Sequence, residues 1–162
     1  MVTRATTVTR TIDLPLETVR RVVESEEFLL TVGDGPGQTV TLTGGERELL
    51  DDGSVTATVT ATFGQGEDAV VMVQRAELSA PDEDGSFTLF TSVPLPGNLG
   101  TMATNQVFAE VEGDPGDVTS LVTTVAVQVD VPVIGPKLVD RVLSGAEQST
   151  DQGVERILRL AS

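Results

Sequence analysis

Residues 136–161 read PKLVDRVLSGAEQSTDQGVERILRLA, and this stretch decides the fold. Its apolar side chains recur mostly at spacings of three and four residues, the period of an amphipathic α-helix. They are Leu138, Val139, Val142, Leu143, Ala146, Val154, Ile157, Leu158 and Ala161. The pattern predicts one helix of about 25 residues, roughly 37 Å long, that begins at about residue 134 or 136. Because a single hairpin cannot bury so long a stripe, we expect the helix to lie across a whole sheet.

The rest of the chain supplies that sheet. Runs of period-two character, separated by glycine, proline and acidic turn residues, predict β-strands. The cleanest run has threonines on one face and apolar side chains on the other, namely Val55, Ala57, Val59, Ala61 and Phe63. Such a run is typical of a half-buried strand. Seven strands are predicted, at residues 2–12, 39–50, 54–63, 68–78, 86–93, 101–112 and 117–131.

Two short helices are predicted after the first strand. Asp13 is a candidate N-cap and Pro15 lies just inside the helix, which are ordinary signals of a helix start. We expect one helix over residues 15–24 and a shorter one that ends at about Leu30. Residues 33–37, which read GDGPG, then predict a loop.

The predicted order of elements is a strand, two short helices, six further strands and a long terminal helix. This order predicts an α+β fold of helix-grip type, in which a curved, seven-stranded antiparallel sheet surrounds the terminal helix. A chain of 162 residues fits one domain, spanning residues 1–162. Gly44 and Gly45 predict a bulge that bends a long strand, as curved sheets require.

The composition argues against several classes of function. Twenty-five acidic and ten basic residues give a formal net charge of −15, which repels nucleic acids and anionic lipid headgroups. Cysteine, histidine, tyrosine and tryptophan are absent, which removes the thiolate, the usual general base and the usual soft-metal ligands. Neither a leader sequence nor an apolar run of about 18 residues is recognisable. We expect an acidic, soluble, cytoplasmic protein without cofactor, metal, nucleic-acid partner or membrane span.

Two short motifs resemble a known superfamily. They are LPLETV at residues 14–19 and VDVPVIGPK at residues 129–137. Together with the order of elements, they resemble the START-like (Bet v 1-like, SRPBCC) superfamily of polyketide cyclases and lipid-transfer proteins, and within it an actinobacterial family of unassigned function. The resemblance implies a deep cavity between the concave face of the sheet and the long helix, which relatives use for lipids, sterols, hormones or polyketides. It implies no catalytic residue, because the superfamily shares no catalytic signature.

Two local patterns are similar to ion sites. The residues Asp82 to Gly85, which read DEDG, resemble the start of a calcium loop. The carboxylate expected about six residues after the glycine is missing, so the pattern favours a hairpin turn. The glycines at positions 33, 35, 37, 44 and 45 lack the spacing and the nearby cation of a phosphate loop.

Polar side chains inside predicted strands mark positions where a partner or ligand is needed, because burying an unpaired polar group is costly. The candidates are Arg47, Arg75, Asn105 and Gln106. Each one either points to solvent or pairs across strands, or else contacts a ligand in the cavity. A one-residue bulge exchanges the two faces of a strand, so the sequence leaves both alternatives open.

Small residues recur at every fourth position of the terminal helix, at Gly145, Ser149 and Gly153. Glycine inside a helix costs roughly 1 kcal/mol and therefore tends to have a reason. Either the helix packs closely on the backbone of the sheet at these positions, or the missing side chains leave space for a ligand.

These observations predict non-enzymatic binding or carriage of an apolar or amphipathic, lipid-like small molecule, by a monomer or a homodimer. The expected ligand-binding residues are Phe63, Met72, Arg75, Phe87, Leu89, Met102, Gln106, Phe108, Val139, Leu143, Ala146 and Val154. No catalytic residue or metal ligand is predicted. Two alternatives remain: a cyclase, dehydratase or hydrolase that uses a cavity carboxylate or Arg75, and a protein-interaction module with a filled core.

Overall fold

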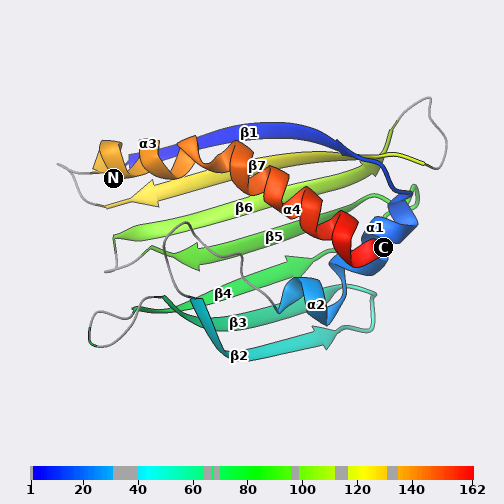
Figure 1. Ribbon diagram of the computed structural model, residues 1–162, viewed down its shortest axis with the longest axis horizontal. Coiled ribbons are helices and arrows are strands. Elements are labelled where there is room, and N and C mark those ends of the chain that lie inside the picture. Colours follow the sequence, from blue (N-terminus) through cyan, green and yellow to red (C-terminus); the bar gives the residue numbers. More distant parts are fainter. Residues whose placement is uncertain are drawn as a thin grey trace.

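The computed structural model describes residues 2–30, 40–63, 67, 70–95, 99–111, 117–130 and 135–162. Its strands are β1 (Val2–Ile12), β2 (Val40–Leu49), β3 (Val55–Phe63), β4 (Val70–Leu78), β5 (Phe87–Pro94), β6 (Gly100–Glu110) and β7 (Thr119–Val129). Its helices are α1 (Leu16–Val23), α2 (Glu26–Leu29), α3 (Gly135–Ser144) and α4 (Ala146–Ala161). Figure 1 shows these elements in the order that the sequence predicts.

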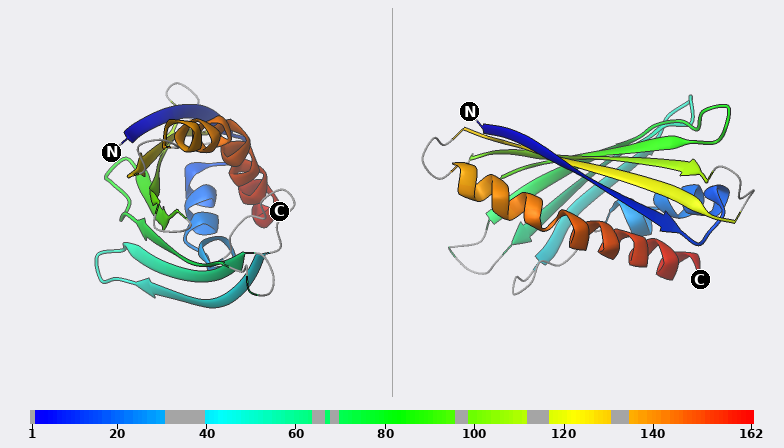
Figure 2. Two further views of the ribbon diagram at one scale, coloured as in Figure 1. Left: turned by 90° about the vertical axis from the view of Figure 1, so that its left-hand side faces the viewer. Right: turned by 90° about the horizontal axis from the view of Figure 1, so that it is seen from above.

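The seven strands form one antiparallel sheet in the order β1-β7-β6-β5-β4-β3-β2. From β2 onward each strand pairs with the next along the chain, and β1 pairs with β7. The register between β2 and β3 shifts between Leu42 and Gly44, which confirms the predicted bulge. The sheet curves around α3 and α4, which run obliquely across its inner face (Figures 1 and 2). The predicted helix-grip fold is therefore confirmed.

The alternation along β3 determines which side chains face inward. Every second residue from Val55 to Ala61 is buried, whereas the threonines between them are half-buried. Cross-strand pairing continues this inner face to Leu78 in β4 and from there to Leu89 in β5. The inner face of the sheet thus follows directly from the alternating pattern of the sequence.

The start of α1 differs from the prediction. The helix begins at Leu16, its N-cap is Pro15 rather than Asp13, and no side chain caps it. The Leu14 N–H donates to the Ile12 carbonyl at 2.8 Å, so the chain turns tightly just after β1 and Asp13 lies ahead of the cap. A proline suits this position because it has no N–H of its own to satisfy.

The long terminal helix is present, with a break that was not predicted. The break is at Gly145, whose N–H donates to the Val142 carbonyl at 3.3 Å, the three-residue spacing of a 3₁₀ turn. The Ser149 N–H donates to the Gly145 carbonyl at 2.9 Å, so α4 continues at once from α3. Among the described residues, no helix has both the length and the apolar character needed to cross a membrane.

The inner face buries two separate apolar clusters, one toward each end of the terminal helix. The cluster beside α1 and α2 contains Ile12, Val19, Val22, Val23, Phe28, Leu29, Val55, Ala57, Ala76, Leu78, Phe87, Leu89, Phe108, Leu121 and Ile157. The cluster beneath α3 contains Val8, Leu95, Val125, Val127, Val129, Val139 and Ala146. In the first cluster the rings of Phe87 and Phe108 stack with their centroids 4.9 Å apart.

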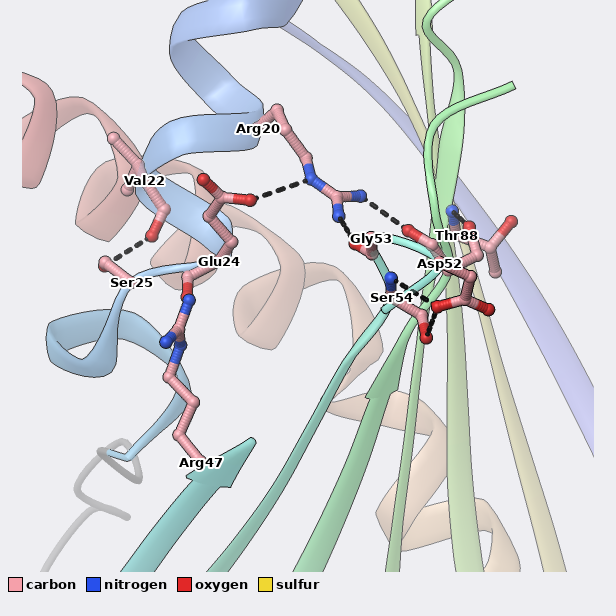
Figure 3. Close-up of polar contacts among 10 residues, drawn as sticks. Arg20, Val22, Glu24, Ser25, Arg47, Asp52, Gly53, Ser54 and Thr88 are labelled. Atoms are coloured by element: carbon pink, nitrogen blue, oxygen red, sulfur yellow. Dashed lines mark hydrogen bonds and ion pairs between the residues drawn. The ribbon is translucent and has the colours of Figure 1, made fainter. Parts of the chain in front are cut away.

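One arginine ties α1 to two hairpin ends (Figure 3). Arg20 donates to the carbonyls of Ser79 at 2.6 Å and Gly53 at 2.9 Å, and it pairs with Glu24 at 3.3 Å. Its guanidinium also lies over the Phe87 ring, 4.9 Å from the centroid. Because its side chain is only 11% exposed, these contacts are largely shielded from water.

Both hairpin ends near Arg20 carry the same Asp-Gly-Ser turn. The Asp52 carboxylate accepts hydrogen bonds from the hydroxyl and the N–H of Ser54, at 2.5 and 2.9 Å. Asp84 accepts the equivalent pair from Ser86, at 2.6 and 3.0 Å. The glycines between them have φ values of 91° and 85°, in the left-handed region that favours glycine. The hairpin turn predicted at residues 82–85 is therefore confirmed.

Replacing Arg20 by alanine is expected to lower the free energy of unfolding by about 2 kcal/mol, because shielded hydrogen bonds to a charged group are lost. Urea-induced unfolding, followed by circular dichroism, measures this change. The matched control is Arg21→Ala, which removes an exposed arginine from the same helix and should stay within about 0.5 kcal/mol of the wild type. Equal effects of the two substitutions would contradict the role assigned to Arg20.

The Asp-Gly-Ser turns predict a specific dependence of stability on pH. Hydrogen bonds from the serine hydroxyl, and then from the serine N–H, hold the pKa of Asp52 and Asp84 below its ordinary value. A lowered folded-state pKa contributes stability that is fully present above the unfolded-state pKa of about 3.9 and is lost as the pH falls through the folded-state pKa.

The double variant Asp52→Asn, Asp84→Asn should therefore lose less stability than the wild type when unfolding is compared at about pH 6 and about pH 3. Asp51→Asn is the control, because the exposed Asp51 carboxylate makes no hydrogen bond within the described residues. A double variant with the full acid sensitivity of the wild type would count against this account.

Candidate ligand-binding site

A cavity of about 440 Å³ lies between α4 and the inner face of strands β4 to β7. In Figure 1, α4 crosses the sheet obliquely, and α2 contacts α4. The volume lies within the range of small-molecule sites, which is about 300 to 1,000 Å³. The cavity therefore has the size and place that the helix-grip fold predicts for a ligand site.

The floor of the cavity is a band of uncharged polar side chains. It consists of Gln74 in β4, Thr91 in β5, Thr104 and Gln106 in β6, and Thr123 in β7. The register sets Thr91 beside Thr104 and Gln106 beside Thr123, and the Gln106 amide donates to the Thr123 hydroxyl at 3.4 Å. Hydroxyl and amide groups both donate and accept, so this band can orient polar groups of a ligand without burying a charge.

The roof of the cavity is α4, at the position of its small residues. A Cβ atom at Gly153 would meet no atom within 4 Å, and both Gly153 and Ser149 line the cavity. Of the two alternatives for the small residues, open space is therefore the one that holds at Gly153. Gly145 has a different role, because it lies at the helix break and does not line the cavity.

Arg156 forms part of the cavity wall between α4 and α2. Its Nη2 donates to the Phe28 carbonyl at 2.9 Å, and its guanidinium lies 4.2 Å from the centroid of the Phe28 ring. Its Nε is buried and has no hydrogen-bond acceptor among the described residues. Burial, followed by the positive charge of Arg159, lowers the pKa of Arg156. The wall thus holds a partly desolvated cation in a fixed position.

The remaining walls are apolar, and one side of the cavity reaches solvent. The apolar lining residues are Phe28, Leu29, Ala76, Leu89, Val93, Met102, Val125 and Ile157. The side that reaches solvent is marked by exposed side chains of α4, namely Ser149, Gln152, Glu155 and Arg159. A ligand can therefore enter along this edge of α4.

The structure divides the twelve predicted ligand-binding residues into several groups. The cavity is lined by Leu89, Met102 and Gln106. Buried in the two apolar clusters are Phe87, Phe108, Val139 and Ala146. Three residues are half-buried and do not line the cavity, namely Met72, Leu143 and Val154. The side chain of Phe63 lies outside the described part of the structure.

Arg75 is placed differently from the other predicted ligand-binding residues. It pairs with Thr58 across β3 and β4, on the outer face of the sheet, and is exposed. A side chain on the outer face cannot contact a ligand in the cavity. The solvent alternative therefore holds for Arg75, because the alternation that contains Ala76 and Leu78 is the inward one.

The other polar residues within strands find partners or face outward. The Arg47 guanidinium donates to the Glu24 carbonyl at 2.6 Å, so it supports the end of α1 (Figure 3). Asn105 lies on the outer face, opposite in register to Phe90. In the described part of the chain, acidic side chains form no group of three or more that could hold a metal ion. The glycines at positions 33, 35 and 37 lie outside the described residues.

The sequence prediction missed the threonines of the floor and Arg156. The alternation assigns threonines to a face only in the run at residues 54–63, where they lie opposite the apolar side chains. Thr91 nevertheless lies two residues beyond Leu89, and Thr104 lies two residues beyond Met102, so both share the alternation of a predicted ligand-binding residue. That period-two relation was the available signal. The apolar pattern of the terminal helix does not indicate that Arg156 lines the cavity. Its position there depends on a hydrogen bond to Phe28 in α2, far away in the sequence.

Comparisons with known proteins support the fold. No protein-family model matches the sequence, and the curated proteins include no significant match. Among solved structures, TTHA0849 from Thermus thermophilus is 20% identical, with a TM-score of 0.58 over 98% of this chain and 100% of that one. Norcoclaurine synthase from Thalictrum flavum is 15% identical, with a TM-score of 0.58 over 99% of this chain and 98% of that one.

The third similar structure is the ZhuI aromatase/cyclase from Streptomyces sp. R1128. It is 13% identical to the chain, with a TM-score of 0.55 over 99% of this chain and 94% of that one. Identities this low show a shared fold and no more. The chain accordingly shares the fold of these three structures over nearly its whole length.

Proposed function

We propose that the protein binds an amphipathic small molecule in the cavity between α4 and the sheet. The observation that carries this proposal is the open space of about 440 Å³ in front of Gly153, in a fold that otherwise buries its inner face. A glycine in a helix is unfavourable by about 1 kcal/mol relative to alanine, and here no neighbouring atom requires one. A requirement for space in the cavity accounts for it.

The mixed lining favours an amphipathic ligand over a purely apolar one. Leu89, Met102 and Val125 offer apolar surface, which stabilises a hydrocarbon part by about 25 cal/mol for each Å² buried. The neighbouring hydroxyls of Thr91 and Thr104 need hydrogen-bond partners once water is displaced. A ligand with one or a few polar groups satisfies both requirements.

Binding or carriage is better supported by these residues than catalysis. Among the described residues that line the cavity, Glu155 alone carries a carboxylate, and its side chain is exposed at the entrance. General acid–base catalysis usually needs a group whose pKa is shifted by burial, as a carboxylate deep in the cavity would be. An enzyme of the cyclase, dehydratase or hydrolase type remains the alternative, as the aromatase/cyclase and norcoclaurine synthase neighbours have the same fold.

The interaction-module alternative has less support. That alternative requires a filled core, whereas the cavity separates the two apolar clusters of the inner face. A likeness to an actinobacterial family of unassigned function and a cytoplasmic location stay predictions.

The experiment compares Gly153→Leu with the wild type in binding of a panel of fatty alcohols, fatty acids and sterols, measured by isothermal titration calorimetry. The wild type should bind at least one of them at a stoichiometry of one. The leucine side chain should occupy the cavity and weaken that binding about tenfold or more, whereas stability should rise because a helix glycine is removed.

Gln148→Leu is the matched control, because Gln148 is an exposed residue of α4 outside the cavity lining. It adds a leucine to the same helix and should leave binding unchanged. Failure of the wild type to bind any member of the panel, or unchanged binding by Gly153→Leu, would refute the proposed site.

A further inference from the structure

Arg156 places a positive charge on the cavity wall without a carboxylate beside it. Its contacts within the described residues are the Phe28 carbonyl at 2.9 Å and the face of the Phe28 ring at 4.2 Å. Its Nε is buried and lacks an acceptor in this part of the chain. These contacts fix the guanidinium in position, but they do not compensate its charge, and a desolvated cation without a counter-charge is unfavourable.

Three other arginines have carboxylate partners. Arg4 and Arg10 in β1 each pair with an aspartate of the terminal helix, at 2.9 and 2.7 Å, and Arg20 pairs with Glu24 at 3.3 Å. Arg47 is held, like Arg156, by a backbone carbonyl, that of Glu24 at 2.6 Å, but it lies outside the cavity lining. Arg156 is thus a cation that is held in place without a carboxylate partner at the point where the cavity meets α4.

The surroundings of Arg156 strengthen the positive potential there. Arg159, one turn further along α4, also lines the cavity and lowers the pKa of Arg156 through its charge. Glu155 lies on the exposed rim and forms no ion pair with Arg156 among the described contacts. The floor of the cavity is uncharged. A negative group inside the cavity would therefore meet the partly desolvated Arg156, where attraction is stronger than in water, with the exposed Arg159 nearby at the rim.

We infer that the ligand is an amphipathic monocarboxylate whose carboxylate binds the Arg156 guanidinium and whose apolar body lies along Leu89, Met102 and Val125. A planar guanidinium matches the two oxygens of a carboxylate, and one partly desolvated arginine matches one negative charge. This inference rests on the proposed function, because it names the chemical class of the ligand in the same cavity.

The experiment uses dodecanoate and 1-dodecanol, which share the hydrocarbon chain and differ in the charge of the head group. Calorimetric titration at about pH 7, where a carboxylic acid is ionised, gives the ratio of their affinities. The wild type should bind dodecanoate on the order of tenfold to a hundredfold more tightly than 1-dodecanol, as expected for a charge-assisted hydrogen bond in a shielded site.

Arg156→Gln should abolish this preference while leaving 1-dodecanol binding within about twofold, and Arg156→Lys should retain part of it. Arg141→Gln removes an exposed arginine of α3 outside the cavity lining and should retain the full preference. Thermal unfolding of each variant shows that it is folded. The preference for charge, unlike total affinity, does not respond to a merely structural loss.

Equal binding of dodecanoate and 1-dodecanol by the wild type, or an unchanged preference in Arg156→Gln, overturns the inference and leaves the proposed function in place. Tighter binding of dodecyl phosphate than of dodecanoate would overturn the assignment of a carboxylate. Absence of binding by both dodecyl probes, when a sterol or another fatty alcohol of the panel binds, overturns this inference alone. Absence of all binding overturns the inference and the proposed function together.

Discussion

The inner face of the sheet is wider than the helix that covers it, and the rest of the structure depends on this mismatch. Seven strands at a spacing of about 4.8 Å span roughly 29 Å, whereas a helix with its side chains is about 10 to 12 Å across. Curvature of the sheet, and the packing of α1 and α2 at one end, reduce the difference. The part that remains uncovered is the cavity beside α4.

The residues at this place follow from the same mismatch. Where the terminal helix contacts the sheet, the inner face is apolar and buried, in two clusters. Between them the inward alternation changes to threonine and glutamine, and the helix presents Gly153 instead of a bulky side chain. A polar band and a helix glycine both reduce stability, as is common where a site serves binding rather than packing. Arg156 is a third feature of this kind, because its charge lacks a carboxylate partner among the described residues.

Elements with a strong period were predictable from the sequence, and local exceptions were not. The alternation of β3 and the apolar stripe of residues 136–161 are repeated often enough to determine the strand, the helix and the overall fold. The N-cap at Pro15 depends on a tight turn after β1, and the helix break depends on one hydrogen bond from the Gly145 N–H to the Val142 carbonyl. The outward position of Arg75 follows from a register across strands, which is a property of the paired sheet rather than of one segment. The apolar part of the site was thus predictable in outline, whereas its polar groups required the register.

The most direct test of the account is native mass spectrometry of the protein purified gently from its source, with extraction and identification of bound molecules. The account predicts a one-to-one adduct of a small amphipathic molecule in the wild type, and its loss when leucine fills the space at Gly153. An adduct that persists in the Gly153→Leu protein, or a protein without any adduct that also fails to bind lipid-like probes, would contradict the claim that this cavity is the binding site.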